Sequence, residues 1–170
     1  MNTIVVDTTQ PFAFGESVTE EYGDFHILQK YQLRFTPKKF SFTLDDVEIV
    51  SLTGEFCGGL KSREYLLKRN HLPLDAFCAM QLYKDEESLY ELGMIWWKKW
   101  GGIESDNELD TMNFFGSVVS GGGTDDMHIV SYKYGFSDPP KFMPFEAGDK
   151  AWSEHNDYAL VFKKGFCGRK

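Results

Sequence analysis

The sequence has no long hydrophobic run and no secretory signal at its start. It lacks the uninterrupted apolar stretch of roughly 18 residues or more that a membrane-spanning helix needs. Its opening residues, MNTIVVDTTQ, have neither the basic segment nor the long apolar segment of a secretory signal. We therefore expect a cytoplasmic protein without a membrane-spanning helix.

Cysteine is scarce, and its spacing matches no common framework. The three cysteines are Cys57, Cys78 and Cys167, and no two of them form a CxxC pair, the spacing of many zinc and redox sites. An odd number leaves at least one thiol unpaired in any disulfide scheme. We expect three reduced thiols in an intracellular protein.

The motifs of common enzyme classes are missing as well. There is no GxSxG segment, and no histidine is paired with Cys57 by its position in the sequence. The glycine-rich segment SGGGTDD (residues 120–126) ends in two aspartates, whereas a phosphate-binding loop needs a lysine and a helix N-terminus. It is typical of a hairpin turn. These absences favour a protein that is not an enzyme and uses no cofactor.

Basic charge is in short supply. Lysine and arginine number 18 against 26 aspartates and glutamates, which gives a net charge of −8. Such a surface repels the phosphates of nucleic acid, so DNA and RNA are not expected as partners. An acidic, solvated surface favours solubility and attracts basic proteins.

Hydrophobic residues are plentiful. They make up 42% of the chain, and aromatic residues alone make up 16%. This composition excludes a disordered chain, and 170 residues suffice for one domain with its own core. We expect a single domain over residues 1–170.

Most of the chain has the patterns of strands. In FSFTL (residues 40–44), large apolar side chains alternate with Ser41 and Thr43, the period of a half-buried strand within a strand-rich region over residues 25–52. The apolar segments on either side of GGGTDD predict an antiparallel hairpin over residues 113–135. A further strand, YALVFKKGF, is expected to close the sheet.

Helices are expected to be few. Ser62 can cap a short helix that Asn70 and Pro73 bring to an end. Because strands follow one another mainly by turns, the sequence predicts a mainly β fold, that is, α+β with minor helix. We expect an antiparallel sandwich or barrel-like sheet with one or two short helices.

Residues 85–100 are ambiguous between helix and hairpin. As a helix, the segment has an acidic start, a basic end and an apolar stripe of Leu89, Leu92, Trp96 and Trp100. As a hairpin, it pairs with the upstream segment FCAMQLY through the polar turn KDEES. Gly93 weakens a helix interior by about 1 kcal/mol, so the hairpin is slightly favoured.

The segment MIWWKKWGG gathers three tryptophans, Trp96, Trp97 and Trp100, within five residues. Such a cluster suits a packed core first, a protein interface second, and a stacking platform for a sugar or a base third. Three exposed indole rings side by side would promote aggregation. We therefore expect at least two of them to be buried, with the third at the surface, where it is available to a partner.

An acidic row follows the tryptophans. If this segment is extended, its alternate carboxylates share one side at a spacing of about 6.7 Å. The row could imitate a phosphate backbone or hold calcium, although it lacks the glycine and glutamate of an EF-hand loop. A solvated loop is the simpler interpretation. Together with the three tryptophans, the row forms a tentative binding set: Glu104, Asp106, Glu108 and Asp110.

A metal site is an alternative. Asp126 and His128 lie two residues apart, and His155 and Asp157 repeat that spacing beside Glu154. Two imidazoles and two carboxylates could bind a divalent metal if the fold brought them together, with Glu154 as general base. This combination would make the protein a metal-dependent hydrolase.

The function that the sequence favours is non-enzymatic. We expect an intracellular binding protein that acts through protein–protein contacts as an inhibitor, an adaptor or an assembly subunit, and a viral protein is one option. Its partner would be another protein or further copies of itself. Besides the hydrolase, a ligand-binding β-barrel with the tryptophans in its cavity remains an alternative.

Overall fold

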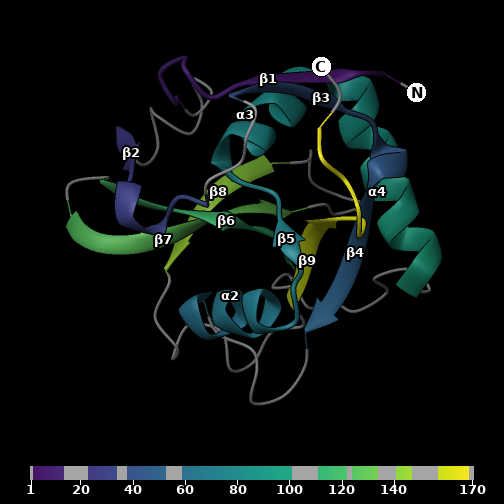
Figure 1. Cartoon of the computed structure of the whole chain (residues 1–170). Helices are drawn as coiled ribbons and strands as arrows, with labels where there is room; N and C mark the ends of the chain where they lie inside the picture. Colours follow the sequence, from purple (N-terminus) through teal and green to yellow (C-terminus); the bar gives the residue numbers. More distant parts are fainter. Residues whose placement is uncertain are drawn as a thin grey trace.

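The computed structural model describes most of the chain, namely residues 2–13, 23–33, 38–52, 59–100, 111–121, 124–133, 141–146 and 157–168. Within these ranges the chain forms a seven-stranded sheet, a two-stranded sheet and three α-helices (Figure 1). The α+β character expected from the sequence is confirmed.

The large sheet is mixed but mainly antiparallel. Its strands follow the order β4 (Val47–Leu52), β9 (Asp157–Phe162), β6 (Thr111–Gly121), β7 (Thr124–Lys133) and β8 (Lys141–Glu146). Two short strands add to this sheet outside the main strand order. Strand β2 (Phe25–Ile27) pairs with β6, and strand β5 (Leu72–Pro73) pairs with β9. Only the β6–β9 pair is parallel among these pairings of the described strands.

The predicted hairpin and closing strand are confirmed. Strands β6 and β7 pair antiparallel, from Met112 opposite Tyr132 to Gly121 opposite Thr124. The segment YALVFKKGF does contain a strand, β9, as expected, and the structure places it between β4 and β6. In the described part of the chain the terminal strands β4 and β8 do not pair with each other, so the sheet does not close into a barrel.

The two-stranded sheet consists of β1 (Ile4–Asp7) and β3 (Lys39–Phe42), which pair antiparallel. The alternation expected around residues 40–44 is confirmed, since Phe40 and Phe42 are buried while Ser41 between them is half-buried. Leu44, however, lies in a 3-10 helix, η2 (Leu44–Asp46). The small sheet lies beside α3 (Figure 1).

The segment that was expected to be a hairpin is helical, so that prediction is wrong. Helix α3 (Ala76–Lys84) occupies FCAMQLY, and α4 (Glu86–Trp100) contains the tryptophans. Each helix has a carboxylate at its start: Asp75 Oδ1 accepts from the Cys78 amide at 2.9 Å, and Asp85 Oδ1 accepts from the Ser88 amide at 3.1 Å. None of the helices in the described ranges is long and apolar enough to cross a bilayer.

Helix α2 (Gly59–Lys68) was expected, but it begins earlier than its predicted cap. Ser62 lies inside the helix and is buried instead of capping it. The helix ends before Asn70, whose φ of 58° is the left-handed conformation that often follows a helix. Pro73 then belongs to β5.

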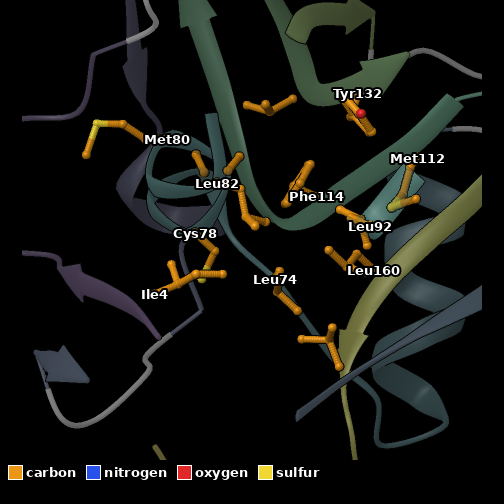
Figure 2. Close-up of a cluster of buried hydrophobic side chains, with 14 of the residues drawn as sticks. Ile4, Leu74, Cys78, Met80, Leu82, Leu92, Met112, Phe114, Tyr132 and Leu160 are labelled. Atoms are coloured by element: carbon orange, nitrogen blue, oxygen red, sulfur yellow. The ribbon is translucent and has the colours of Figure 1, made fainter. Parts of the chain in front are cut away.

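The large sheet is covered on both faces, which explains why β6 is buried at every position from Thr111 to Ser120. Met112 and Phe114 face a core shared with α3, α4 and the small sheet (Figure 2). Phe115 and Val118 face a second core beneath α2. The sheet therefore separates α2 from the other two helices.

Strand β6 bulges where the chain before α3 crosses it. Its pairing with β7 shifts between Phe114 and Val119. At this bulge the Leu74 amide donates to the Leu160 carbonyl, and the Gly116 amide donates to the Leu74 carbonyl, both at 2.9 Å. The segment before α3 thus fills the gap between β9 and β6 and fixes the start of the helix.

Candidate functional site

Helix α4 carries one tryptophan into the core. Trp96 is fully buried, and its ring lies edge-on against Tyr158 at a centroid distance of 5.2 Å. Leu89 and Leu92 complete the buried stripe of the helix. The indole nitrogen of Trp96 has no hydrogen-bond partner in the described part of the chain.

The outer side of α4 carries an aromatic stripe, which we define as Tyr90, Met94 and Trp97. Residues four and seven positions apart lie on the same side of a helix. Tyr90 is 61% exposed and Trp97 is 37% exposed, while Met94 between them is half-buried.

The expectation for the tryptophan cluster is met in part. Trp96 is buried and Trp97 is at the surface, whereas the side chain of Trp100 lies outside the described residues. The burial of at least two of the three therefore stays a prediction. Lys99 reaches back from α4 and donates to the Ile49 carbonyl at 3.0 Å, which fastens the end of the helix to β4.

The acidic row lies outside the described residues at all four positions, Glu104, Asp106, Glu108 and Asp110. Other carboxylates lie at the start of α4. Glu87 and Asp85 accept hydrogen bonds from the side-chain amide of Asn2, at 3.0 and 3.2 Å. The stripe therefore lies next to an acidic helix end held by the first residues of the chain.

The residues of the alternative metal site are not all described. Asp126 is exposed, and His128 Nδ1 lies 3.0 Å from the Asp126 backbone carbonyl. The His128 ring packs edge-on against Phe25 at 5.5 Å. Glu154 and His155 lie outside the described ranges, as does the side chain of Asp157.

The sheet register places the backbones of Asp157 and His128 near opposite ends of β6. The backbone of Asp157 is opposite Thr111 at one end of β6, while His128 is opposite Val119 near the other end. Among the described side chains no group of three or more histidines, cysteines or acidic residues could hold a metal ion.

Arg63 is a buried arginine that the sequence patterns did not indicate. Arg63, on the inner side of α2, is only 8% exposed. Its guanidinium donates to the backbone carbonyl of Phe115 in the β6 bulge and to that of Tyr31. Burial lowers the pKa of the guanidinium below its usual value. The segment REYLLK resembles an ordinary solvated helix, and only the position of Arg63 three residues before the buried Leu66 hints at burial.

Arg63 also lines a hollow beside α2 with a volume of about 500 Å³. The 3-10 helix η1 (Gln29–Tyr31) forms the opposite wall. On the rim, Glu64 and Lys68 form an ion pair at 2.8 Å, which lowers the pKa of the Glu64 carboxyl. The lining residues are Tyr31, Leu60, Arg63, Glu64, Leu67 and Lys68.

A polar network holds the β6 bulge to the start of α3. Gln32 donates to Asp75 at 2.8 Å and accepts from Ser117 at 2.6 Å. The Ser117 hydroxyl in turn accepts from the Ala76 amide at 2.9 Å. Each contact satisfies a buried or half-buried polar group, so this network is explained by the fold.

The two described thiols are both free. Cys78 is buried, and burial raises the pKa of its thiol well above the usual value, whereas Cys167 is exposed. Cys57 lies outside the described residues.

The described residues thus offer two surface features for binding, the aromatic stripe of α4 and the hollow beside α2. Neither contains a nucleophile paired with a base among the described residues. No family model, curated protein or solved structure matches the chain.

Proposed function

We propose that this is a non-enzymatic, cytoplasmic binding protein that docks on a partner protein through the aromatic stripe of α4. The observation that supports this function most directly is the exposure of Tyr90 and Trp97 on one side of the same helix. Tyrosine and tryptophan are enriched among the residues that contribute most to protein–protein affinity. Covering the two rings would remove a large apolar area from water.

The charge of the chain suggests the chemistry of the partner. The protein has a net charge of −8, and Glu86, Glu87 and Glu91 lie on the same helix as the stripe. A complementary surface would hold an apolar groove for the two rings and basic side chains around it. An inhibitor, an adaptor or an assembly subunit could use such a surface in the same way.

Cross-linking from defined positions tests this function. A photoreactive amino acid placed at Tyr90 or Trp97 should capture one and the same protein in the source cell. Ile95 provides a matched control, because it lies on the same helix and is 38% exposed, close to the 37% of Trp97, but is off the stripe. The same probe at Ile95 should capture much less of that protein.

Affinity measured with the captured protein in pure form completes the test. Removal of a central aromatic anchor typically costs about 2 kcal/mol or more, so Trp97→Ala should weaken binding by about 30-fold. Ile95→Ala should change the affinity less than threefold. If the two variants bind equally well, or if all three positions capture the same proteins, the stripe is not the docking surface.

The same variants test whether the protein associates with itself through the stripe. Sedimentation of the protein alone gives its mass in solution, and a dimer formed through the stripe should dissociate in Trp97→Ala but not in Ile95→Ala. A dimer that persists in both variants forms through another surface, and the stripe is then not the site of self-association.

A further inference from the structure

Arg63 is a buried positive charge that no carboxylate neutralises in the described part of the chain. It is 8% exposed, and its guanidinium donates to the two backbone carbonyls of Phe115 and Tyr31. A carbonyl carries only a partial negative charge, and a buried ion is costly unless an opposite charge compensates it. Within the part of the chain that the structure describes, the cation beneath α2 therefore has no compensating charge.

The guanidinium has hydrogen-bonding capacity to spare. An arginine side chain offers five N–H donors in a planar fork, and each of its two terminal nitrogens carries two of them. One terminal nitrogen contacts Phe115 and the other contacts Tyr31. The carbonyls hold the fork in place, and donors remain for an acceptor that comes from outside the chain.

The hollow beside α2 gives such an acceptor access to Arg63. Its volume of about 500 Å³ lies within the usual range of small-molecule sites, roughly 300–1,000 Å³. Besides the arginine, its walls include the apolar side chains of Leu60 and Leu67 and the ring of Tyr31. The site thus combines one cation with an apolar lining.

The charges around the hollow limit the ligand to a single negative charge. Lys68 already pairs with Glu64 at 2.8 Å, so this rim contributes no net charge. Only Arg63 remains unpaired among the charged lining residues, and the net charge of −8 disfavours an ion with several negative charges. A carboxylate matches a guanidinium fork in shape as well as in charge.

We propose that the hollow binds a small monocarboxylate with an apolar tail, its carboxylate on the Arg63 guanidinium and its tail against Leu60, Leu67 and Tyr31. This site is separate from the α4 stripe, because α2 and α4 cover opposite faces of the large sheet (Figure 1). A failure of one proposal therefore leaves the other standing.

Octanoate is a suitable probe for the full-length protein. Titration followed by methyl NMR should show saturable shifts at Leu60 and Leu67. Octanol, which has the tail without the charge, and acetate, which has the charge without the tail, should each bind at least tenfold more weakly. Octyl phosphate, with its higher charge, should also bind more weakly than octanoate.

Each arm of the titration can overturn the proposal. Equal affinity for octanol would make the hollow a purely apolar site. Tighter binding of octyl phosphate would make it a phosphate site. Shifts that avoid both leucines, or no saturation at millimolar concentrations, would show that no monocarboxylate binds there.

A variant that preserves the Arg63 contacts links binding to the arginine. Leu67 lies four residues after Arg63, on the same side of α2, and is half-buried at the edge of the hollow. In Leu67→Glu the new carboxylate would occupy the guanidinium, so octanoate should bind at least tenfold more weakly while the circular dichroism spectrum stays unchanged.

Lys61→Gln is the matched control for Leu67→Glu. It lowers the net charge by the same one unit at an exposed position of the same helix, away from the lining of the hollow. Its affinity for octanoate should stay within twofold of the parent. Unchanged binding in folded Leu67→Glu, or an equal loss in both variants, would refute the role of Arg63.

Discussion

Gly116 lies directly against the backbone of Leu74. Its amide donates to the Leu74 carbonyl at 2.9 Å, and a Cβ on Gly116 would stand 2.8 Å from that oxygen and 2.6 Å from the carbonyl oxygen of Pro73. Both atoms belong to the backbone, so they cannot swing aside as a flexible side chain could. The crossing of β6 by the segment before α3 therefore depends on glycine at this position.

We predict that Gly116→Ala destabilises the protein by about 1–3 kcal/mol or more, the range for overpacking a tight interior. Urea denaturation followed by circular dichroism measures the loss. Gly165→Ala is the control, because Gly165 has a φ of 87° but no atom within 4 Å of its added Cβ. That control isolates the cost of backbone strain, about 1–2 kcal/mol. A midpoint for Gly116→Ala at or above that of Gly165→Ala would contradict the predicted clash.

The strands could be predicted because their side chains have a period of two. Phe40 and Phe42 alternate with polar neighbours, and the two segments around GGGTDD have the length and composition of paired strands. Buried strands also reveal themselves by apolar runs, and β6 and β9 pack on both faces. Local pattern and tertiary environment agree in these elements.

Helices α3 and α4 were harder to identify for a physical reason. Five consecutive residues of α3, from Ala76 to Met80, are buried, so the helix has no polar stripe to show a period of 3.6. The stronger signals were the carboxylates at Asp75 and Asp85, each of which caps a helix. Gly93 counted against the helix in the sequence, yet it lies buried within α4.

The hollow beside α2 could not be predicted from the sequence. Its walls come from η1 and α2, and Arg63 also contacts Phe115 from β6. No local pattern reports which segments meet in three dimensions. The aromatic stripe could be predicted only in part. The tryptophan cluster pointed to Trp97, but Tyr90 falls on the same side as Trp97 only if the segment is a helix.

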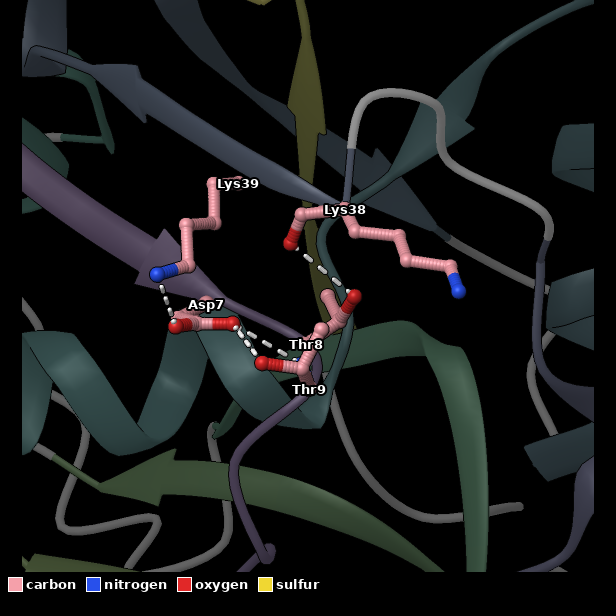
Figure 3. Close-up of polar contacts among 5 residues, drawn as sticks. All are labelled: Asp7, Thr8, Thr9, Lys38 and Lys39. Carbon is pink, nitrogen blue, oxygen red and sulfur yellow. Dashed lines mark hydrogen bonds and ion pairs between the residues drawn. The ribbon is translucent and has the colours of Figure 1, made fainter.

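The contacts of Asp7 predict an unusually low pKa for its carboxyl group. Its carboxylate accepts from the Thr9 hydroxyl at 2.5 Å and pairs with Lys39 at 3.0 Å (Figure 3). The Thr9 hydroxyl is the main cause that lowers the pKa of Asp7 from 3.8 to about 2, and Lys39 adds to it. Carbon-detected NMR should therefore find the Asp7 carboxyl titrating near pH 2.

The sign of the effect follows from linkage. Because the pKa of Asp7 is lower in the folded state, the group stabilises the fold above pH 3.8 and loses that contribution as the pH falls towards 2. Thr9→Val should raise the pKa of Asp7. Thr8→Val is the control, since the Thr8 hydroxyl donates to the Lys38 carbonyl instead (Figure 3). The assignment fails if both variants shift the pKa equally.

The thiols should differ sharply in reactivity. A thiol reagent should modify exposed Cys167 at once but reach buried Cys78 only as the protein unfolds, because burial blocks access and raises the pKa of that thiol. In denaturant without reductant, all three cysteines should react. Mass spectrometry counts the modified sites, and a single modified site in the unfolded protein would reveal a disulfide.

Trp96 and Trp97 should separate stability from binding, although they are neighbours in the sequence. Trp96 is fully buried against Tyr158, so Trp96→Ala should cost about 3–5 kcal/mol of stability. Trp97 is 37% exposed on the outer stripe, and Trp97→Ala should cost no more than about 1 kcal/mol. Urea denaturation followed by circular dichroism compares the two without relying on tryptophan fluorescence.

Trp96→Phe refines this comparison. It keeps an aromatic ring in the core and removes an indole N–H that has no partner among the described residues, a group whose burial costs about 1–3 kcal/mol. The loss in Trp96→Phe should therefore be much smaller than in Trp96→Ala. If Trp96→Ala unfolds at the same urea concentration as the parent, α4 does not anchor the core through this ring. In that case the whole tryptophan cluster, and not the outer stripe alone, should be tested as the binding surface.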